Sequence, residues 1–169
     1  MTVDPTQEPV AALIRMLDLA DGGGARTTED IFVGRTITTP RARVYGGQVL
    51  AQAAMAAMRT VDPGRAIHSL HAYFLRGGDI ELPITFGVER VRDGRSFSAR
   101  RIHAYQEGKT ILSVIASFQE PAEGLEHQDE MPEGVPDPES LPALRETLGA
   151  LDIPEARAQA FERPFDMRY

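Results

Sequence analysis

The chain contains no cysteine, and this absence removes several chemistries at once. It excludes disulfide bonds, thiolate nucleophiles and the usual zinc cages. We therefore expect neither a metal nor a cofactor, and a cytoplasmic location fits a chain without disulfides. No apolar run is long enough to span a bilayer. The first five residues, Met1 to Pro5, also lack the basic and apolar blocks of a signal peptide.

Positive charge is also scarce, because the formal net charge is −7 at pH 7. This balance argues against general nucleic-acid binding. The acidity belongs to one segment: residues 120–139 hold eight Asp or Glu and no Lys or Arg, so the other 149 residues sum to about +1. With 169 residues and 42% apolar content, the chain suits one ordinary globular domain with a fair core.

Three familiar motifs are missing as well. There is no Walker loop and no G-x-G-x-x-G, so the chain does not bind nucleotide phosphates by those devices. There is no G-x-S-x-G, so the nucleophile elbow of a serine hydrolase is absent.

The chain does have one dominant helix signal, which is rich in alanine and runs from Gln48 to about Val61. Apolar residues cover more than half of its circumference, which is typical of a buried helix. The preceding pair, Gly46-Gly47, has two interpretations. It forms a tight turn, or it leaves backbone N–H groups bare at the positive end of the helix dipole, where a developing oxyanion would be stabilised.

Strand signals follow this helix in close succession, with turn signals at Asp93-Gly94 and Glu107-Gly108. The predicted strands cover residues 30–38, 67–76, 84–92, 95–106 and 110–119. A helix over residues 8–20, ended by glycines 22–24, precedes them. The sequence therefore predicts an α+β domain over residues 8–120, in which an antiparallel sheet of about five strands covers one long helix.

The character of the chain changes after residue 120. Five of its twelve prolines lie in residues 120–142, a composition typical of an extended linker. Residues 141–148 and 154–161 predict two short helices, and a strand signal begins near residue 163. Because a linker connects two folded parts, we expect residues 121–169 to lead to a second domain that this chain does not contain.

Two groups of side chains are candidates for a site. On a strand, His68 and His71 should face opposite sides of the sheet, so they cannot share a metal. Each is a satisfied histidine in a half-buried sheet, or, for His71, a residue that lines a groove. The second group either holds the phosphates of an acidic ligand or forms a solvated hairpin tip; it consists of Arg90, Arg92, Arg95, Arg100 and Arg101.

Four blocks of the sequence are more specific than any of these signals. They are RVYGGQ at residues 43–48, HSLHAYFLRGGD at 68–79, RDGRSFSARR at 92–101 and ASFQ at 116–119. In this order they closely resemble the N-terminal half of the acyl-CoA thioesterase II (TesB) family. The likeness covers about residues 8–169.

The resemblance implies a hotdog fold, in which an antiparallel sheet wraps a long central helix. In this family two hotdog repeats in one chain pack into a double hotdog and hydrolyse acyl-CoA to a free fatty acid and CoA. An Asp, a Thr or Ser and a Gln of the second repeat activate the water, and no position of this chain matches them. The resemblance thus implies acyl-CoA as substrate, and as partner a second hotdog repeat or another copy of this chain in a homo-oligomer.

Within this half the resemblance implies a supporting groove wall. The candidates are Gly46, Gly47 and Gln48 for the oxyanion, His71 for the groove, and Arg100 and Arg101 for the CoA phosphates. The alternative is a non-catalytic half that binds acyl-CoA or pairs with a second hotdog without hydrolysis, because no Asp lies on the central helix. A hotdog hydratase would need an Asp and a His near the helix start, and residues 40–55 contain neither.

Overall fold

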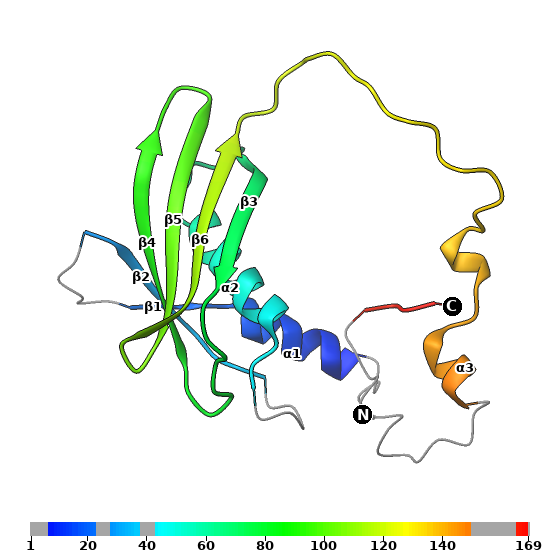
Figure 1. Cartoon of the computed structure of the whole chain (residues 1–169), viewed down its shortest axis with the longest axis horizontal. Coiled ribbons are helices and arrows are strands. Elements are labelled where there is room, and N and C mark those ends of the chain that lie inside the picture. Colours follow the sequence, from blue (N-terminus) through cyan, green and yellow to red (C-terminus); the bar gives the residue numbers. More distant parts are fainter. Residues whose placement is uncertain (1–6, 23–27, 38–42, 150–164, 169) are drawn as a thin grey trace. The chain divides into compact units, whose positions relative to one another are not determined.

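The structure is a computed structural model that describes residues 7–22, 28–37, 43–149 and 165–168. Figure 1 shows its elements in chain order, which are α1 (Gln7–Leu17), β1 (Ala20–Asp21), β2 (Asp30–Gly34), α2 (Gly46–Met58), β3 (Ala66–Phe74), β4 (Ile84–Asp93), β5 (Phe97–Gln106), β6 (Lys109–Gln119), the 3₁₀ turn η1 (Pro138–Ser140) and α3 (Leu144–Gly149). The chain separates into two compact units, residues 14–122 and the two ends of the chain, residues 1–13 and 123–169.

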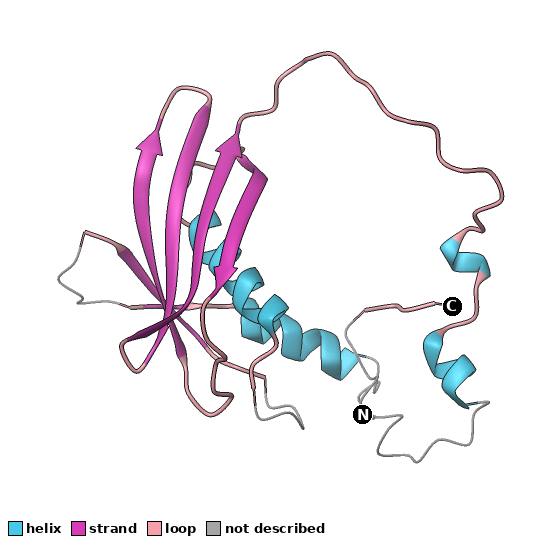
Figure 2. Ribbon diagram, viewed as in Figure 1, coloured by secondary structure: helices cyan, strands magenta, loops and turns pink. Residues whose placement is uncertain are grey.

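The strands of residues 14–122 form one antiparallel sheet in the order β1-β2-β4-β5-β6-β3 (Figure 2). β3 therefore lies at one edge of this sheet, beside β6. The sheet has one strand more than the sequence predicts, because the predicted helix over residues 8–20 ends at Leu17. Beyond it Leu19 is buried in the core, and Ala20 and Asp21 pair with β2 as the short strand β1.

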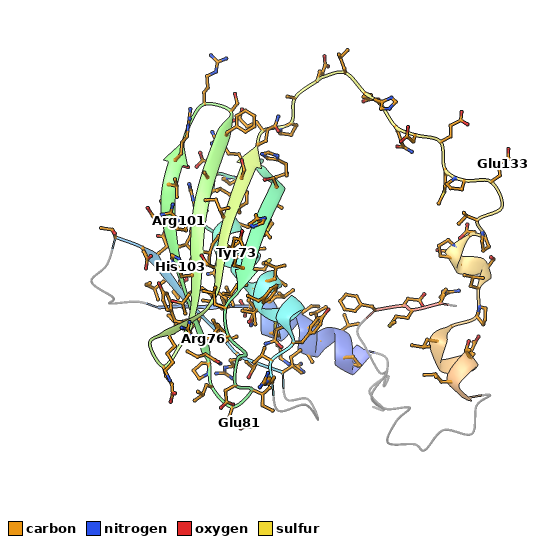
Figure 3. The ribbon with its side chains drawn as sticks, viewed as in Figure 1. Tyr73, Arg76, Glu81, Arg101, His103 and Glu133 are labelled. Carbon is orange, nitrogen blue, oxygen red and sulfur yellow. The ribbon has the colours of Figure 1, made fainter. Side chains whose placement is uncertain are left out.

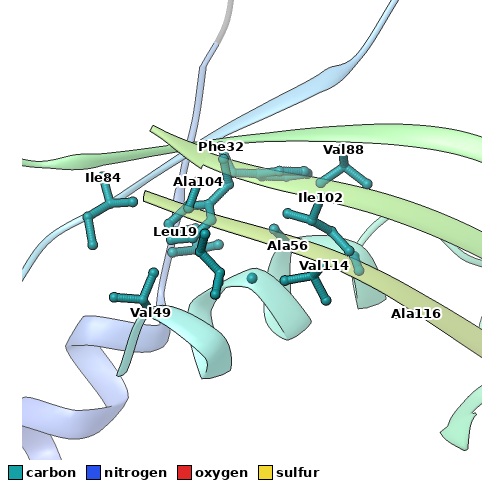
Figure 4. Packing of buried hydrophobic residues seen from close by; sticks show 14 of the residues in the cluster. Leu19, Phe32, Val49, Ala56, Ile84, Val88, Ile102, Ala104, Val114 and Ala116 are labelled. Atoms are coloured by element: carbon teal, nitrogen blue, oxygen red, sulfur yellow. The ribbon is translucent and has the colours of Figure 1, made fainter. Parts of the chain in front are cut away.

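The core lies between α2 and the concave face of the sheet. Ala53, Ala56 and Ala57 are fully buried, so their small side chains let the helix approach β3 to β6 closely. Figure 4 shows side chains of the sheet, such as Ile102 and Val114, facing Val49 and Ala56 of the helix. This arrangement confirms the buried central helix and the α+β architecture.

The ends of α2 and of the first long strand differ from the predicted bounds. The helix ends at Met58 instead of Val61, because the N–H groups of Thr60 and Val61 donate to carbonyls three residues back in a tight final turn. The strand predicted over residues 30–38 ends at Gly34. Past this point the chain turns toward α2, and the N–H of Ile37 donates to the Gln48 side chain at 3.4 Å.

The two hairpins use different turns. Glu107 and Gly108 have φ values of 48° and 72°, so they form the tight turn that needs two left-handed residues, as predicted. Gly94 does not take that conformation, and residues 94–96 form a longer connection in which the Gly94 N–H donates to Phe97 O at 2.8 Å. The two-residue turn predicted there is wrong because Asp93 stays within β4, where its carboxylate accepts from Ser98 and Arg100.

Little regular structure is present in the described residues of the C-terminal segment, residues 123–149 and 165–168. Residues 123–137 form no helix or strand and are exposed. The predicted helix over residues 141–148 corresponds to α3, whereas the one over 154–161 lies outside the described residues. Near the predicted final strand, Arg168 forms an isolated antiparallel bridge with Ala143. None of the described helices is both long and apolar enough to cross a membrane.

Candidate functional site at the start of α2

A cavity of about 350 Å³ lies beside the first turn of α2, a size typical of small-molecule sites. Three elements build its walls: the entrance and first turn of α2, the chain from the end of β3 onward, and the start of β6. Its apolar lining consists of Val44, Val49, Phe74, Leu75, Ile111 and Leu112. Such a lining suits an apolar chain, because each methylene buried there is removed from water.

The N-terminus of α2 contributes unpaired backbone donors to this region. Tyr45 is the N-cap, and its side chain makes no capping hydrogen bond. Its carbonyl accepts from the N–H groups of Gln48 at 3.0 Å and Val49 at 3.4 Å. Helix geometry leaves the first N–H groups without intrahelical acceptors, and no described residue accepts from Gly46 or Gly47. Of the three predicted oxyanion residues, Gly46 and Gly47 thus retain their N–H groups, and Gln48 does not.

Two aromatic rings lie close to the glycines of this entrance. A Cβ atom on Gly46 would lie 3.0 Å from the ring of Phe74, and one on Gly47 would lie 2.4 Å from the ring of Tyr45. Any side chain at residue 47 would therefore displace the tyrosine ring. Both interpretations of the pair fit this geometry, since Gly46 forms part of the tight entrance and also lines the cavity.

The side chain of Gln48 serves a different purpose. It is buried, accepts from Ile37 N and points its amide nitrogen at Arg35 O, 3.4 Å away. One turn on, the Gln52 amide donates to Met16 O and Arg35 O, both at 2.8 Å. These two glutamines fasten the chain that leaves β2 to one side of α2. Gln48 therefore does not line the cavity.

The structure corrects the orientation predicted for the two histidines. A β-bulge between Ile67 and Ser69 inserts one residue into β3, so His68 turns to the outer face of the sheet and contacts the Ser117 hydroxyl at 2.9 Å. His71 is on that outer face too, where its ring meets the ring of Tyr73 edge-on. Both histidines thus face away from α2, and His71 does not line the cavity. The described residues contain no cluster of three potential metal ligands.

Arg100 cannot act as a phosphate contact. Its side chain is 1% exposed and points inward, toward the end of α2. All five guanidinium N–H groups are used, by the hydroxyl and carbonyl of Thr60, the carbonyls of Arg92 and Ala99, and the carboxylate of Asp93. This hydrogen bond from Arg100 holds the pKa of Asp93 below its ordinary value. The arginine is part of the folded core.

Arg101, one residue further on, points the opposite way. It lies half-exposed on the outer face of the sheet, where it pairs with Glu89 at 2.9 Å (Figure 3). The same figure labels His103 on the neighbouring part of β5 and Arg76 at the far end of the sheet. A phosphate role for Arg101 would thus place a ligand on the face opposite the cavity.

The sequence did not single out the two arginines that the structure places at the cavity, Arg43 and Arg76. Arg76 is in the cavity wall and donates to Thr110 O at 2.7 Å. The Arg43 side chain lies against Gly77, another residue of the cavity wall. A Cβ atom added at Gly77 would lie 3.2 Å from Cδ of Arg43. A usable signal was present, because both arginines occur in the sequence blocks 43–48 and 68–79 beside glycines that allow close approach.

Comparisons with known proteins agree with this geometry. The chain is 21% identical to a conserved protein of unknown function with hot dog fold from Alicyclobacillus acidocaldarius, over 88% of this chain and 52% of that one, with a TM-score of 0.66. At this identity the likeness shows the fold, and the expected hotdog fold is confirmed. The family model of the acyl-CoA thioesterase N-terminal domain matches residues 27–119. The chain belongs to this family.

Closer relatives carry related names. Acyl-CoA thioesterase 2 of Haemophilus influenzae is 43% identical over 82% of this chain and 49% of its own length. The crystal structure of an acyl-CoA thioesterase II, TesB2, from Mycobacterium marinum is 44% identical over 80% of this chain and 47% of that chain, with a TM-score of 0.65. The chain therefore spans about half the length of these relatives.

Proposed function

We propose that this chain is the N-terminal half of an acyl-CoA thioesterase, which hydrolyses acyl-CoA to a free fatty acid and CoA. Membership of the family and the names of the relatives support the reaction class. The single observation that carries the proposal within this chain is the apolar cavity lined by Gly46, at the helix start where the N–H groups of Gly46 and Gly47 have no described acceptor.

The proposed chemistry uses these groups at the thioester carbonyl. A base takes a proton from water as the water oxygen attacks the carbonyl carbon, and the carbonyl oxygen becomes an oxyanion. The carbonyl then re-forms as the carbon–sulfur bond breaks, and the proton passes to the leaving sulfur to give the CoA thiol. The N–H groups of Gly46 and Gly47 and the positive end of the α2 dipole stabilise that oxyanion. Loss of one such donor typically lowers the rate by roughly 10²- to 10³-fold.

The base that activates the water must come from outside this cavity. None of the described residues in its lining is an Asp, Glu or His. We therefore propose that the second hotdog repeat supplies the base, and that this half supplies the oxyanion donors and part of the groove. The same observation favours the second candidate function, a half that binds acyl-CoA or pairs with a second hotdog without hydrolysis.

The partner is proposed to cover the free edge of β3. Within the described sheet this strand has a neighbour on one side only. Its last residues and the one that follows are apolar and exposed: Tyr73 by 65%, Phe74 by 57% and Leu75 by 51%. Such an edge invites pairing with another chain or repeat. We propose a second hotdog repeat or, for the chain alone, a homo-oligomer; a monodisperse monomer in light scattering would contradict the latter.

We also propose a cytoplasmic location, which the absence of cysteine supports.

Release of the CoA thiol from a medium-chain acyl-CoA tests the reaction. A thiol reagent gives no background with this protein, because it has no cysteine. We expect little release by the chain alone and clear release once a second hotdog half of the family is added. Binding without release in both samples would support the non-catalytic candidate.

A further inference from the structure

Two cationic side chains, Arg43 and Arg76, lie at the apolar cavity. Within the described residues, neither Arg43 nor Arg76 forms an ion pair, whereas arginines elsewhere on the sheet do. Both are exposed. Arg76 is in the cavity wall, and the Arg43 side chain runs along the backbone of Gly77 in the same wall. The cavity thus combines an apolar lining with two cationic side chains that form no ion pair with any described residue.

The carboxylate of Asp79 lies on the segment that pairs with Arg43 but forms no ion pair with it. Its Oδ1 atom instead accepts from the Glu81 N–H at 2.9 Å. The loop that carries Asp79 is held in place by Gln106. The side-chain oxygen of Gln106 accepts from Asp79 N, and its nitrogen donates to Asp79 O and Leu82 O, all within 2.9 Å. The backbone of this loop is therefore held by the fold itself, beside the two arginines.

We propose that this cavity binds an apolar chain whose anionic group is held by Arg43 and Arg76. Guanidinium groups suit carboxylate and phosphate alike, because they donate paired N–H groups to two oxygens. The anion therefore has two chemical sources: the carboxylate of a fatty acid or a phosphate of a CoA thioester. The proposal rests on the proposed function in using the same cavity, and it assigns to these two arginines the anion contact that Arg100 cannot make.

Calorimetric titration of the 169-residue chain tests the proposal with octanoate, decanoate, dodecanoate, decanol, decanoyl-CoA and free CoA. The variants are Arg43→Gln, Arg76→Gln and the double variant. Arg95→Gln is the matched control, because it makes the same charge change at an exposed position of the β4–β5 connection. Circular dichroism and thermal unfolding of each variant establish that it is folded.

We expect saturable binding of the anionic ligands, tightened by up to about fourfold per added methylene until the cavity is full. Each single variant should weaken binding roughly two- to fivefold, as for exposed ion pairs, and the double variant by roughly tenfold. Arg95→Gln should change the affinity for the anionic ligands by less than about twofold. Decanol should bind the wild type and the double variant equally. If the double variant binds decanoate more weakly than the wild type, the anion held by the arginines is a carboxylate. If it weakens the binding of decanoyl-CoA only, the anion is a phosphate.

Three results would overturn the proposal. The first is an absence of saturable binding for every ligand, and the second is an equal loss in Arg95→Gln and in the double variant. The third is a double variant that binds both decanoate and decanoyl-CoA as tightly as the wild type does. Because the titration needs no turnover, a failure of hydrolysis leaves its result intact, and the two proposals fail separately.

Discussion

The Nε group of Arg100 donates a 2.7 Å hydrogen bond to the hydroxyl of Thr60, which joins the middle of β5 to the turn after α2. The Thr60 carbonyl also accepts a hydrogen bond from Arg100, and the Thr60 hydroxyl donates one to Ala57 O. A charged side chain buried this deeply persists only when its donors are matched. Arg100 therefore fixes the end of the central helix against the sheet.

We expect Arg100→Met to lower the free energy of unfolding by about 2–4 kcal/mol, because several buried acceptors lose their donor. Arg101→Met is the matched control on the outer face, where loss of an exposed ion pair should cost about 1 kcal/mol or less. Urea unfolding of both variants measures the difference. Equal destabilisation would show that Arg100 has no special structural role.

The lowered pKa of Asp93 predicts a pH-dependent contribution to stability. The hydrogen bond from Arg100 favours the carboxylate in the folded state, so the folded pKa lies below the unfolded one. The stabilisation is fully present above the unfolded pKa and disappears as the pH falls through the folded value. Urea unfolding of wild type and Asp93→Asn should therefore differ at neutral pH and converge in acid. Asp129→Asn, at a fully exposed position, should match the wild type throughout, and a difference for Asp93→Asn that persists in acid would refute this account.

The turn at Gly108 predicts a simple backbone effect. Its φ of 72° is left-handed, and an added Cβ would meet nothing within 4 Å, so any cost of Gly108→Ala comes from the backbone alone. We expect a loss of about 1 kcal/mol. Gly124→Ala, which also has open space but no positive φ, should be nearly neutral. Thermal or urea unfolding distinguishes the two, and equal effects would contradict the turn assignment.

Gly47→Val tests the oxyanion role in an enzyme that carries both repeats. The new side chain meets the Tyr45 ring and crowds the N–H groups at the start of α2. We expect kcat/KM to fall by roughly 10²-fold or more. The double variant Gly47→Val/Tyr45→Ala removes the clash with the ring and should not restore activity. Unchanged kcat/KM in Gly47→Val would remove the oxyanion proposal, and full rescue by Tyr45→Ala would reduce it to a steric effect.

Much of the fold follows from local patterns. The alanine-rich run from residue 48 and the alternation in β6 predict the buried helix and the two-faced strand, because burial depends on side chains a few positions apart. The ends of the helices and strands are harder to predict from the sequence. Ala20 and Asp21 are not helical because they pair with β2, next to Leu19 in the core. The local sequence contains no sign of this pairing.

The site was harder to predict, because it depends on which face each side chain occupies. The bulge after Ile67 reverses the face of His68, and Arg100 and Arg101 diverge to opposite sides of β5. The sequence shows five arginines near one hairpin and cannot show which of them are buried. Arg43 and Arg76 are 33 positions apart, and only the folded chain brings Arg43 beside Gly77, the neighbour of Arg76.

The most direct test of the central claim is CoA release by a chimera, in which this chain replaces the matching half of Haemophilus influenzae acyl-CoA thioesterase 2. We expect the chimera to release thiol from decanoyl-CoA far above the uncatalysed rate, and this chain alone to release little. A folded chimera that binds decanoyl-CoA and releases no thiol would contradict the claim that this half builds a working thioesterase groove. Turnover by the chain alone would contradict the claim that the second repeat supplies the base.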